Sequence, residues 1–140
     1  MAVYLDASVL LALFTNDAFT ARADAFLRRR KPTVCVSDFG AAEFSSAVAR
    51  RVRMKELTRK EGEAAFSTFD AWIERTTHRV EVLPSDVRVT ESFLRRLDLN
   101  LRTADALNLA IAQRVNADLA TFDRKMAAAA RTLQIAVART

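Results

Sequence analysis

The sequence has little of the residue types that mark many specialised sites: it contains two glycines, two prolines, one cysteine and one histidine. The single cysteine, Cys35, excludes an internal disulfide and a thiolate zinc cluster. Gly40 and Gly62 lie far apart, which excludes both the G-x-G-x-x-G dinucleotide loop and the glycine-rich P-loop. Hydrolysis by a pair of histidines is excluded because His78 has no second histidine to act with.

Long apolar runs are also missing. None approaches the roughly 18 residues that a membrane-spanning helix needs, and no charged segment followed by an apolar stretch marks a signal peptide. We therefore expect a soluble, cytoplasmic protein that does not bind a membrane. Hydrophobic residues make up 51% of the 140 residues, enough for a core in one domain. The net charge of +5 favours a nucleic acid or an acidic partner.

Apolar runs alternate with helical patterns along the chain, and this alternation predicts an α/β fold. Runs that are apolar throughout suit central strands, whereas runs that alternate polar and apolar residues suit edge strands. Since crossovers between parallel strands are right-handed, we expect a three-layer α/β/α fold with a parallel sheet in the order 3-2-1-4-5. The five strands are expected at residues 2–5, 33–36, 79–83, 118–122 and 133–137.

Start and stop signals place the helices between these strands. A capping box begins one helix at Thr58, and Pro32 ends an earlier one after a run of basic residues. Ser37 or Asp38 is expected to cap the helix that reaches about Val52. The remaining helices are expected to begin near Ala7 or Ser8, near Phe19, at Ser85, at Thr103 and at Arg124.

Four carboxylates occupy positions that would meet at one edge of this sheet. Asp6 directly follows the first strand, Glu43 lies just past the second, and Asp123 follows the fourth. Asp105 opens the helix before the fourth strand, and it reaches the same edge if residues 83–102 carry the chain back there. Asp6 has a second interpretation, since an Asp at this position also caps a helix. We expect the four acids to share one cleft.

Four acids in one cleft repel each other unless a cation balances them. Ligands that are all oxygen favour Mg²⁺ or Mn²⁺ over zinc. Such a site can activate water and stabilise the charge of an in-line phosphoryl displacement. Ser8, Thr103 and Thr121 could bind water in this site, although helix capping explains Ser8 and Thr103 nearly as well.

The pattern of acids resembles that of PIN-domain ribonucleases, and in particular the VapC-type toxins of bacterial toxin–antitoxin pairs. Each matching segment is weak alone, but the set in this order spans nearly the whole chain. The segments are Val3-Tyr4-Leu5-Asp6-Ala7-Ser8, Val36-Ser37-Asp38-Phe39-Gly40-Ala41-Ala42-Glu43, Leu101-Arg102-Thr103-Ala104-Asp105-Ala106-Leu107 and Ala120-Thr121-Phe122-Asp123.

This resemblance implies a single PIN domain over residues 1–140 that acts as a metal-dependent endoribonuclease. It implies an acidic quartet of Asp6, Glu43, Asp105 and Asp123, which binds Mg²⁺ or Mn²⁺. It also implies an antitoxin protein, whose C-terminal segment lies along the active-site groove, and a homodimer. The RNA contacts that we expect are the basic residues beside these acids, namely Arg102, Arg124 and Lys125.

Two other readings of the sequence lead elsewhere. A haloacid-dehalogenase-like phosphatase needs Asp-x-Asp after the first strand, whereas this chain has Asp6-Ala7-Ser8. A non-catalytic RNA- or protein-binding module on the same fold stays open. Metal-dependent cleavage that is lost on Asp6→Asn would separate that module from an enzyme.

Overall fold

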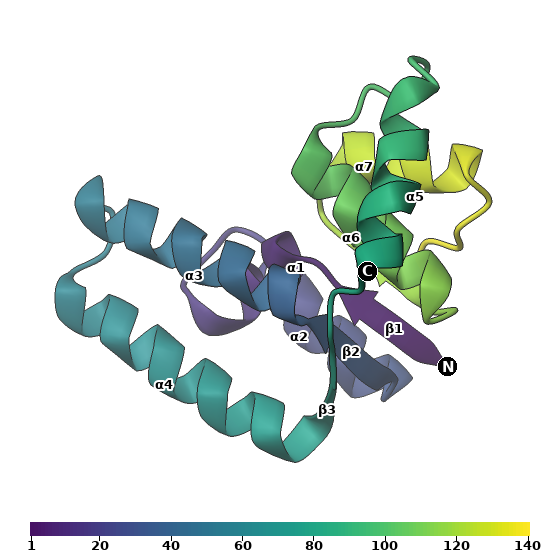
Figure 1. The fold of residues 1–140 in the computed structure, drawn as a ribbon. Helices are drawn as coiled ribbons and strands as arrows, with labels where there is room; N and C mark the ends of the chain where they lie inside the picture. The colour runs from purple at the N-terminus through teal and green to yellow at the C-terminus, as the bar shows by residue number, and fades with distance from the viewer.

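Four parallel strands form the sheet at the centre of the molecule (Figure 1). The computed structural model describes all of residues 1–140. The strands lie in the order β3-β2-β1-β4. Val3 pairs with Val34 on one side and with Asp118 on the other, so β1 is central. The strands are β1 (Ala2–Leu5), β2 (Thr33–Ser37), β3 (Thr77–Val80) and β4 (Asp118–Ala120).

Helices cover both faces of this sheet, as the three-layer prediction requires. Side chains of β1 alternate between the two faces: Val3 and Leu5 belong to one core cluster, and Tyr4 to the other. The first face carries α1 (Ala7–Phe14), α2 (Thr20–Arg30), α3 (Asp38–Arg53) and α4 (Arg59–Thr76). The second carries α5 (Pro84–Arg95), α6 (Thr103–Arg114) and α7 (Arg124–Thr132), which gather on one side of Figure 1.

The predicted fifth strand, residues 133–137, is wrong. The segment makes one isolated parallel bridge, between Leu119 and Val137. Helix α7 continues to Thr132, and Gln134 then adopts a left-handed backbone with φ 61°. This turn uses the residues that would have extended the strand, so only the end of the segment reaches β4. The edge position after β4 was right, but the order among regular strands is 3-2-1-4.

The third strand lies earlier than predicted, at Thr77–Val80 instead of residues 79–83. Helix α4 passes directly into it, and the chain then leaves the sheet toward α5. Pro84 occupies the first turn of α5, where its missing N–H costs nothing. The residue expected to end the strand therefore begins the helix, and Leu83, not Ser85, is the N-cap.

Polar residues cap the helices that start at the carboxyl edge of the sheet. Asp6 accepts a hydrogen bond from the Val9 N–H in α1, and Ser37 accepts one from the Gly40 N–H in α3. The Thr58 capping box of α4 is present as predicted. No helix combines the length and the apolar composition that a membrane crossing requires.

Candidate active site

Parallel pairing puts the carboxyl ends of all four strands at one edge of the sheet, where open α/β folds bind their ligands. Asp6 follows β1 there, and Asp123 follows β4 as the N-cap of α7. Glu43 lies in the second turn of α3, which starts from the end of β2. Asp105 lies in the first turn of α6. It reaches the same edge because this helix starts there and runs back toward the beginning of β4.

Asp6 is held on several sides. The carboxylate accepts hydrogen bonds from the Ser8 hydroxyl at 2.6 Å, from the Val9 N–H at 3.1 Å and from the Thr121 hydroxyl. The residue is 5% exposed. Burial raises the pKa of Asp6, and the bonds from Ser8, Thr121 and Val9 offset part of that rise. Asp6 thus caps α1, which is one of its two expected roles, and it lies at the carboxyl edge of the sheet, where the second role would place it.

A chain of hydrogen bonds orients Glu43 from the opposite face of the sheet. The Asn108 amide donates from Nδ2 to Glu43 Oε1 at 2.6 Å, and the Tyr4 hydroxyl donates to Asn108 Oδ1. Since Tyr4 has one hydroxyl proton, Ser37 Oγ must donate to the Tyr4 oxygen, 2.6 Å away. The Gly40 N–H donates to Ser37 Oγ. These directions fix the amide of Asn108 with its NH₂ group toward Glu43.

The charges of the acids act on one another at this edge. Burial raises the pKa of Glu43, the bond from Asn108 lowers it, and the negative charges of Asp6 and Asp105 raise it again. Arg102 lowers it by a smaller amount. Asp6, Glu43 and Asp105 are therefore within electrostatic reach of one another, although they come from distant parts of the sequence.

Asp105 and Asp123 line one cavity of about 430 Å³. Asp105 accepts from the Arg102 backbone N–H at 3.4 Å and forms an ion pair with its guanidinium at the same distance. Asp123 Oδ1 accepts from the N–H groups of Lys125 and Met126. Arg102 and Lys125 line this cavity too, so positive and negative side chains face the same space.

The three neutral residues predicted beside the acids have different surroundings. Ser8 donates to Asp6 and accepts from the Phe122 N–H at 2.9 Å. Thr121 donates to Asp6 and accepts from the Asp123 N–H at 3.0 Å, so it joins two of the acids. Thr103 is exposed in the first turn of α6 and forms no hydrogen bond to the acids.

The donor set fits a hard divalent cation, because it consists of carboxylate oxygens whose mutual repulsion a cation would relieve. No group of three or more acidic, histidine or cysteine side chains is arranged to hold a metal ion, however. Mg²⁺ needs only one or two direct carboxylate ligands, since it keeps several of its waters. The residues therefore fit such an ion, and the four-acid metal site stays a prediction.

Sequence reasoning missed the residues that support Glu43, namely Tyr4, Ser37 and Asn108. Tyr4 was read as part of an apolar strand, yet its hydroxyl is fully buried within the polar chain. Asn108 had a detectable signal: it lies between two leucines in a helix with a long apolar stretch, three residues after Asp105. A polar side chain in that position must find a buried partner. His78 is exposed in β3 and forms no hydrogen bond to the acids.

Comparison with known proteins adds to this geometry. A family model described as "PIN domain" matches residues 3–132. Ribonuclease VapC46 of Mycobacterium tuberculosis is 35% identical over 139 residues, which cover 97% of this chain and 95% of that protein. The family match therefore spans all four acids and all of the sheet except Ala2.

Two solved structures have the same fold. VapC20 of Mycobacterium tuberculosis, a sarcin-ricin loop cleaving toxin, superposes with a TM-score of 0.74 at 19% identity, with 91% of this chain and 94% of its own covered. VapBC2 from Rickettsia felis, bound to a DNA fragment from their promoter, has a TM-score of 0.64 at 16% identity, with 88% of each chain covered. These likenesses establish the arrangement of the strands and helices.

Proposed function

Because the chain belongs to the PIN domain family, we propose that it is an endoribonuclease that hydrolyses RNA phosphodiester bonds as the toxin of a toxin–antitoxin pair. The identity with Ribonuclease VapC46 along almost the full length of both chains carries this proposal. The acids at the carboxyl edge of the sheet agree with it. We take residues 1–140 as one PIN domain.

We propose that Asp6, Glu43, Asp105 and Asp123 form the catalytic site and bind Mg²⁺ or Mn²⁺. When bound, the ion would activate the attacking water and stabilise the negative charge of the in-line phosphoryl displacement. The ligand oxygens of Asp6 are held by Ser8 and Thr121, and Glu43 is aimed by Asn108. Such bonds from outside the ligand set keep carboxylates in position without reorganisation.

Basic side chains beside the acids would hold the RNA. Arg102 and Lys125 line the cavity of Asp105 and Asp123, and Arg124 lines the neighbouring one. A phosphate that enters between them meets positive charge on the protein side, which offsets its repulsion from the acids. We propose these three residues as RNA contacts.

The partner is an antitoxin protein, as the family membership supports, and we propose that one of its basic side chains enters the acidic site. The solved VapBC2 structure is a complex named for both of its components.

We also propose a homodimer. Light scattering that gives the mass of one chain at working concentration would contradict the dimer.

Sequencing of RNA ends tests the proposed function. Expression of the wild-type protein in bacterial cells should produce new 5′ ends at a small set of positions, and expression of Asp6→Asn should not. A non-catalytic binding module would leave the RNA ends unchanged in both cultures. New ends that are equally abundant with Asp6→Asn would show that another nuclease makes them.

A further inference from the structure

Two adjoining cavities lie on the side of the site where α2 meets the end of the chain. One has a volume of about 570 Å³, the other about 630 Å³, and both are lined by Arg22, Arg139 and Thr140. The two cavities adjoin at these residues, and we call them together the arginine groove. Its arginines are Arg22, Arg29, Arg30, Arg124, Arg131 and Arg139.

The arginines of this groove have no acidic partners. The structure contains seven ion pairs, and none of them includes an arginine of the groove. Asp123 is the one acidic residue that lines it. Arg22 donates to the Thr140 backbone oxygen at 3.2 Å. The groove thus carries an excess of positive charge, and a groove of this kind attracts a polyanion.

An aromatic pair lies in the same groove. The rings of Phe19 and Phe122 stack with their centroids 4.6 Å apart and their planes 10° apart. The Arg22 guanidinium lies 5.5 Å from the Phe19 centroid and 5.2 Å from the Phe122 centroid. Phe19 is 37% exposed, so part of its ring is open to a ligand. Aromatic rings among cations are the usual platform for bases of a single strand.

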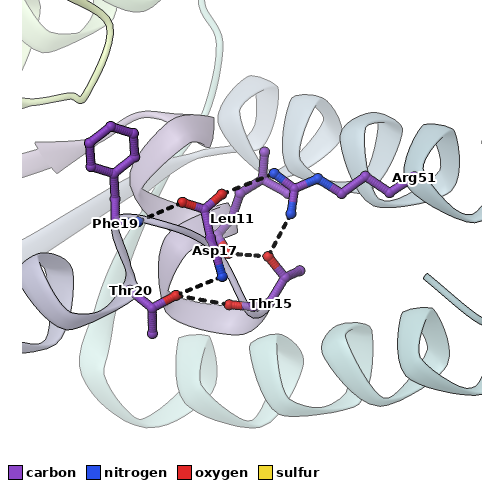
Figure 2. A network of polar contacts seen from close by, with 6 residues as sticks. All are labelled: Leu11, Thr15, Asp17, Phe19, Thr20 and Arg51. Atoms are coloured by element: carbon purple, nitrogen blue, oxygen red, sulfur yellow. Dashed lines mark hydrogen bonds and ion pairs between the residues drawn. The ribbon is translucent and has the colours of Figure 1, made fainter. Parts of the chain in front are cut away.

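Hydrogen bonds hold Phe19 in place (Figure 2). Its N–H donates to Asp17 Oδ1 at 2.8 Å, and the other oxygen of Asp17 pairs with Arg51 of α3 at 3.0 Å. Arg51 also donates to the Thr15 hydroxyl at 2.9 Å. Figure 2 shows that the Phe19 ring points away from this network, so the contacts fix its backbone and do not involve the ring, which stacks on Phe122.

Phe122 connects the aromatic pair to the acids. Its N–H donates to Ser8 Oγ, which itself donates to Asp6. Asp123 lines both the arginine groove and the cavity of Asp105. A strand in the groove can therefore continue past Asp123 into that cavity without leaving the protein surface.

We propose that the arginine groove binds the single-stranded RNA on one side of the scissile phosphate. The arginines hold its phosphates, and a base stacks on Phe19. The recognition is of backbone and base plane, so it is independent of sequence. This inference rests on the proposed ribonuclease function, and it extends the RNA contacts beyond Arg102, Arg124 and Lys125 to arginines of α2.

The test measures binding of a fluorescent single-stranded oligoribonucleotide to the inactive Asp6→Asn protein over a series of salt concentrations. The groove pair Arg29→Gln/Arg139→Gln should lower the affinity about tenfold or more at low salt. The slope of log K against log salt should become shallower by about 0.7 for each phosphate contact removed. The matched control is Arg75→Gln/Arg88→Gln, which removes two exposed arginines outside the groove.

The aromatic platform has its own variants. Phe19→Ala should weaken RNA binding about tenfold, the scale of one lost base stack, and leave the salt slope unchanged because no charge is removed. Phe19→Tyr keeps an aromatic ring at this position, so its affinity for RNA should equal that of the protein with Phe19. Circular dichroism and melting temperatures of all variants would establish that they remain folded.

Two outcomes would overturn the proposal. If the control pair weakened binding as much as the groove pair, the effect would be one of net charge alone. If the groove pair kept its RNA affinity and lost binding to the antitoxin, the groove would be a protein contact. Binding in the inactive background does not depend on catalysis, so absence of RNA cleavage by the wild type would contradict the proposed function separately.

Discussion

The side-chain amide of Asn108 donates a hydrogen bond to the Glu43 carboxylate, with 2.6 Å between Nδ2 and Oε1. This contact joins α6 to α3 above the carboxyl edge of the sheet. Asn108 has no freedom to turn, because its carbonyl oxygen accepts from Tyr4 and its amide also donates to the Ala104 carbonyl. The direction of Glu43 therefore depends on a buried network that starts in β1.

Removal of Asn108 should affect both activity and stability. Asn108→Ala frees Glu43 and leaves the Tyr4 hydroxyl without its acceptor, so we expect a 10–100-fold loss of cleavage rate, roughly the effect of deleting such a partner. The free energy of unfolding should fall by about 1–3 kcal/mol. Tyr4→Phe should show a smaller loss of both. Cleavage kinetics measure the loss of rate, and urea unfolding measures the loss of stability. An Asn108→Ala protein with wild-type kinetics would contradict the orienting role.

Asp6→Asn should stabilise the metal-free protein at neutral pH. Burial raises the pKa of Asp6 in the folded state, so this state binds more protons than the unfolded chain between the ordinary and the raised value. Wild-type stability therefore falls as the pH rises through that interval. Asn carries no charge, so the variant should lack this fall and should melt at a higher temperature than the wild type at pH 7.

Melting in excess chelator from about pH 4 to pH 8 would measure this difference. The control is Asp118→Asn, which removes an acid on the same sheet outside the candidate site. A gap between wild type and Asp6→Asn that stayed constant over this range would mean that the Asp6 carboxylate is not penalised in the folded state.

The contribution of Asp86 to stability should depend on pH in the opposite direction to that of Asp6. Asp86 is 2% exposed and accepts from Arg114 at 2.7 and 3.0 Å and from the Leu83 N–H at 2.8 Å. Burial raises the pKa of Asp86, but the bonds from Arg114 and Leu83 together outweigh it and leave the pKa below its ordinary value. The stabilisation is present above the ordinary pKa and is lost as the pH falls through the lowered one.

We therefore expect Asp86→Asn to lower the free energy of unfolding by about 2–3 kcal/mol at pH 7, because it leaves Arg114 without its partner. The difference should shrink in acid. Glu91→Gln is the matched control, since its ion pair with Arg95 is exposed and should contribute less than about 1 kcal/mol. Urea unfolding at several pH values gives both numbers, and an Asp86→Asn loss equal to that of Glu91→Gln would refute the prediction.

Glu43→Gln should separate metal binding from folding. The variant keeps an oxygen that can accept from Asn108 and removes one negative charge from the site. Mn²⁺ should raise the melting temperature of the wild type more than that of the variant, because a ligand stabilises the folded state more when it binds that state more tightly. Thermal melts over a metal titration measure this. An equal response of both proteins, with the exposed Glu63→Gln as control, would exclude Glu43 from the metal site.

The sequence predicted the layers and the central strands because these depend on local patterns. Apolar runs at β1, β2 and β4 and caps such as Thr58 are each visible within a few residues. The limits of β3 and the fifth strand were missed because they depend on neighbouring helices. Pro84 fits either the end of a strand or the start of a helix, and packing of α5 decides between them.

The sequence predicted that the acids meet at one edge of the sheet, but it did not predict which side chains hold them there. Parallel topology alone brings Asp6 and Asp123 to one edge. Whether carboxylates converge depends on side-chain partners far away in sequence, such as Thr121 for Asp6 and Asn108 for Glu43. No local pattern encodes those pairings, so the support of Glu43 by Asn108 emerged only from the structure.

Cleavage of a defined single-stranded RNA by the purified protein is the measurement that tests the central claim most directly. The wild type should cut the RNA in Mg²⁺ or Mn²⁺, should stop in excess chelator and should recover when the metal is restored, because carboxylate oxygens are ligands for hard cations. Asp6→Asn should remain folded and inactive under all of these conditions. Undiminished cleavage by the wild type in chelator, or wild-type rates for Asp6→Asn, would contradict a metal-dependent ribonuclease built on these acids.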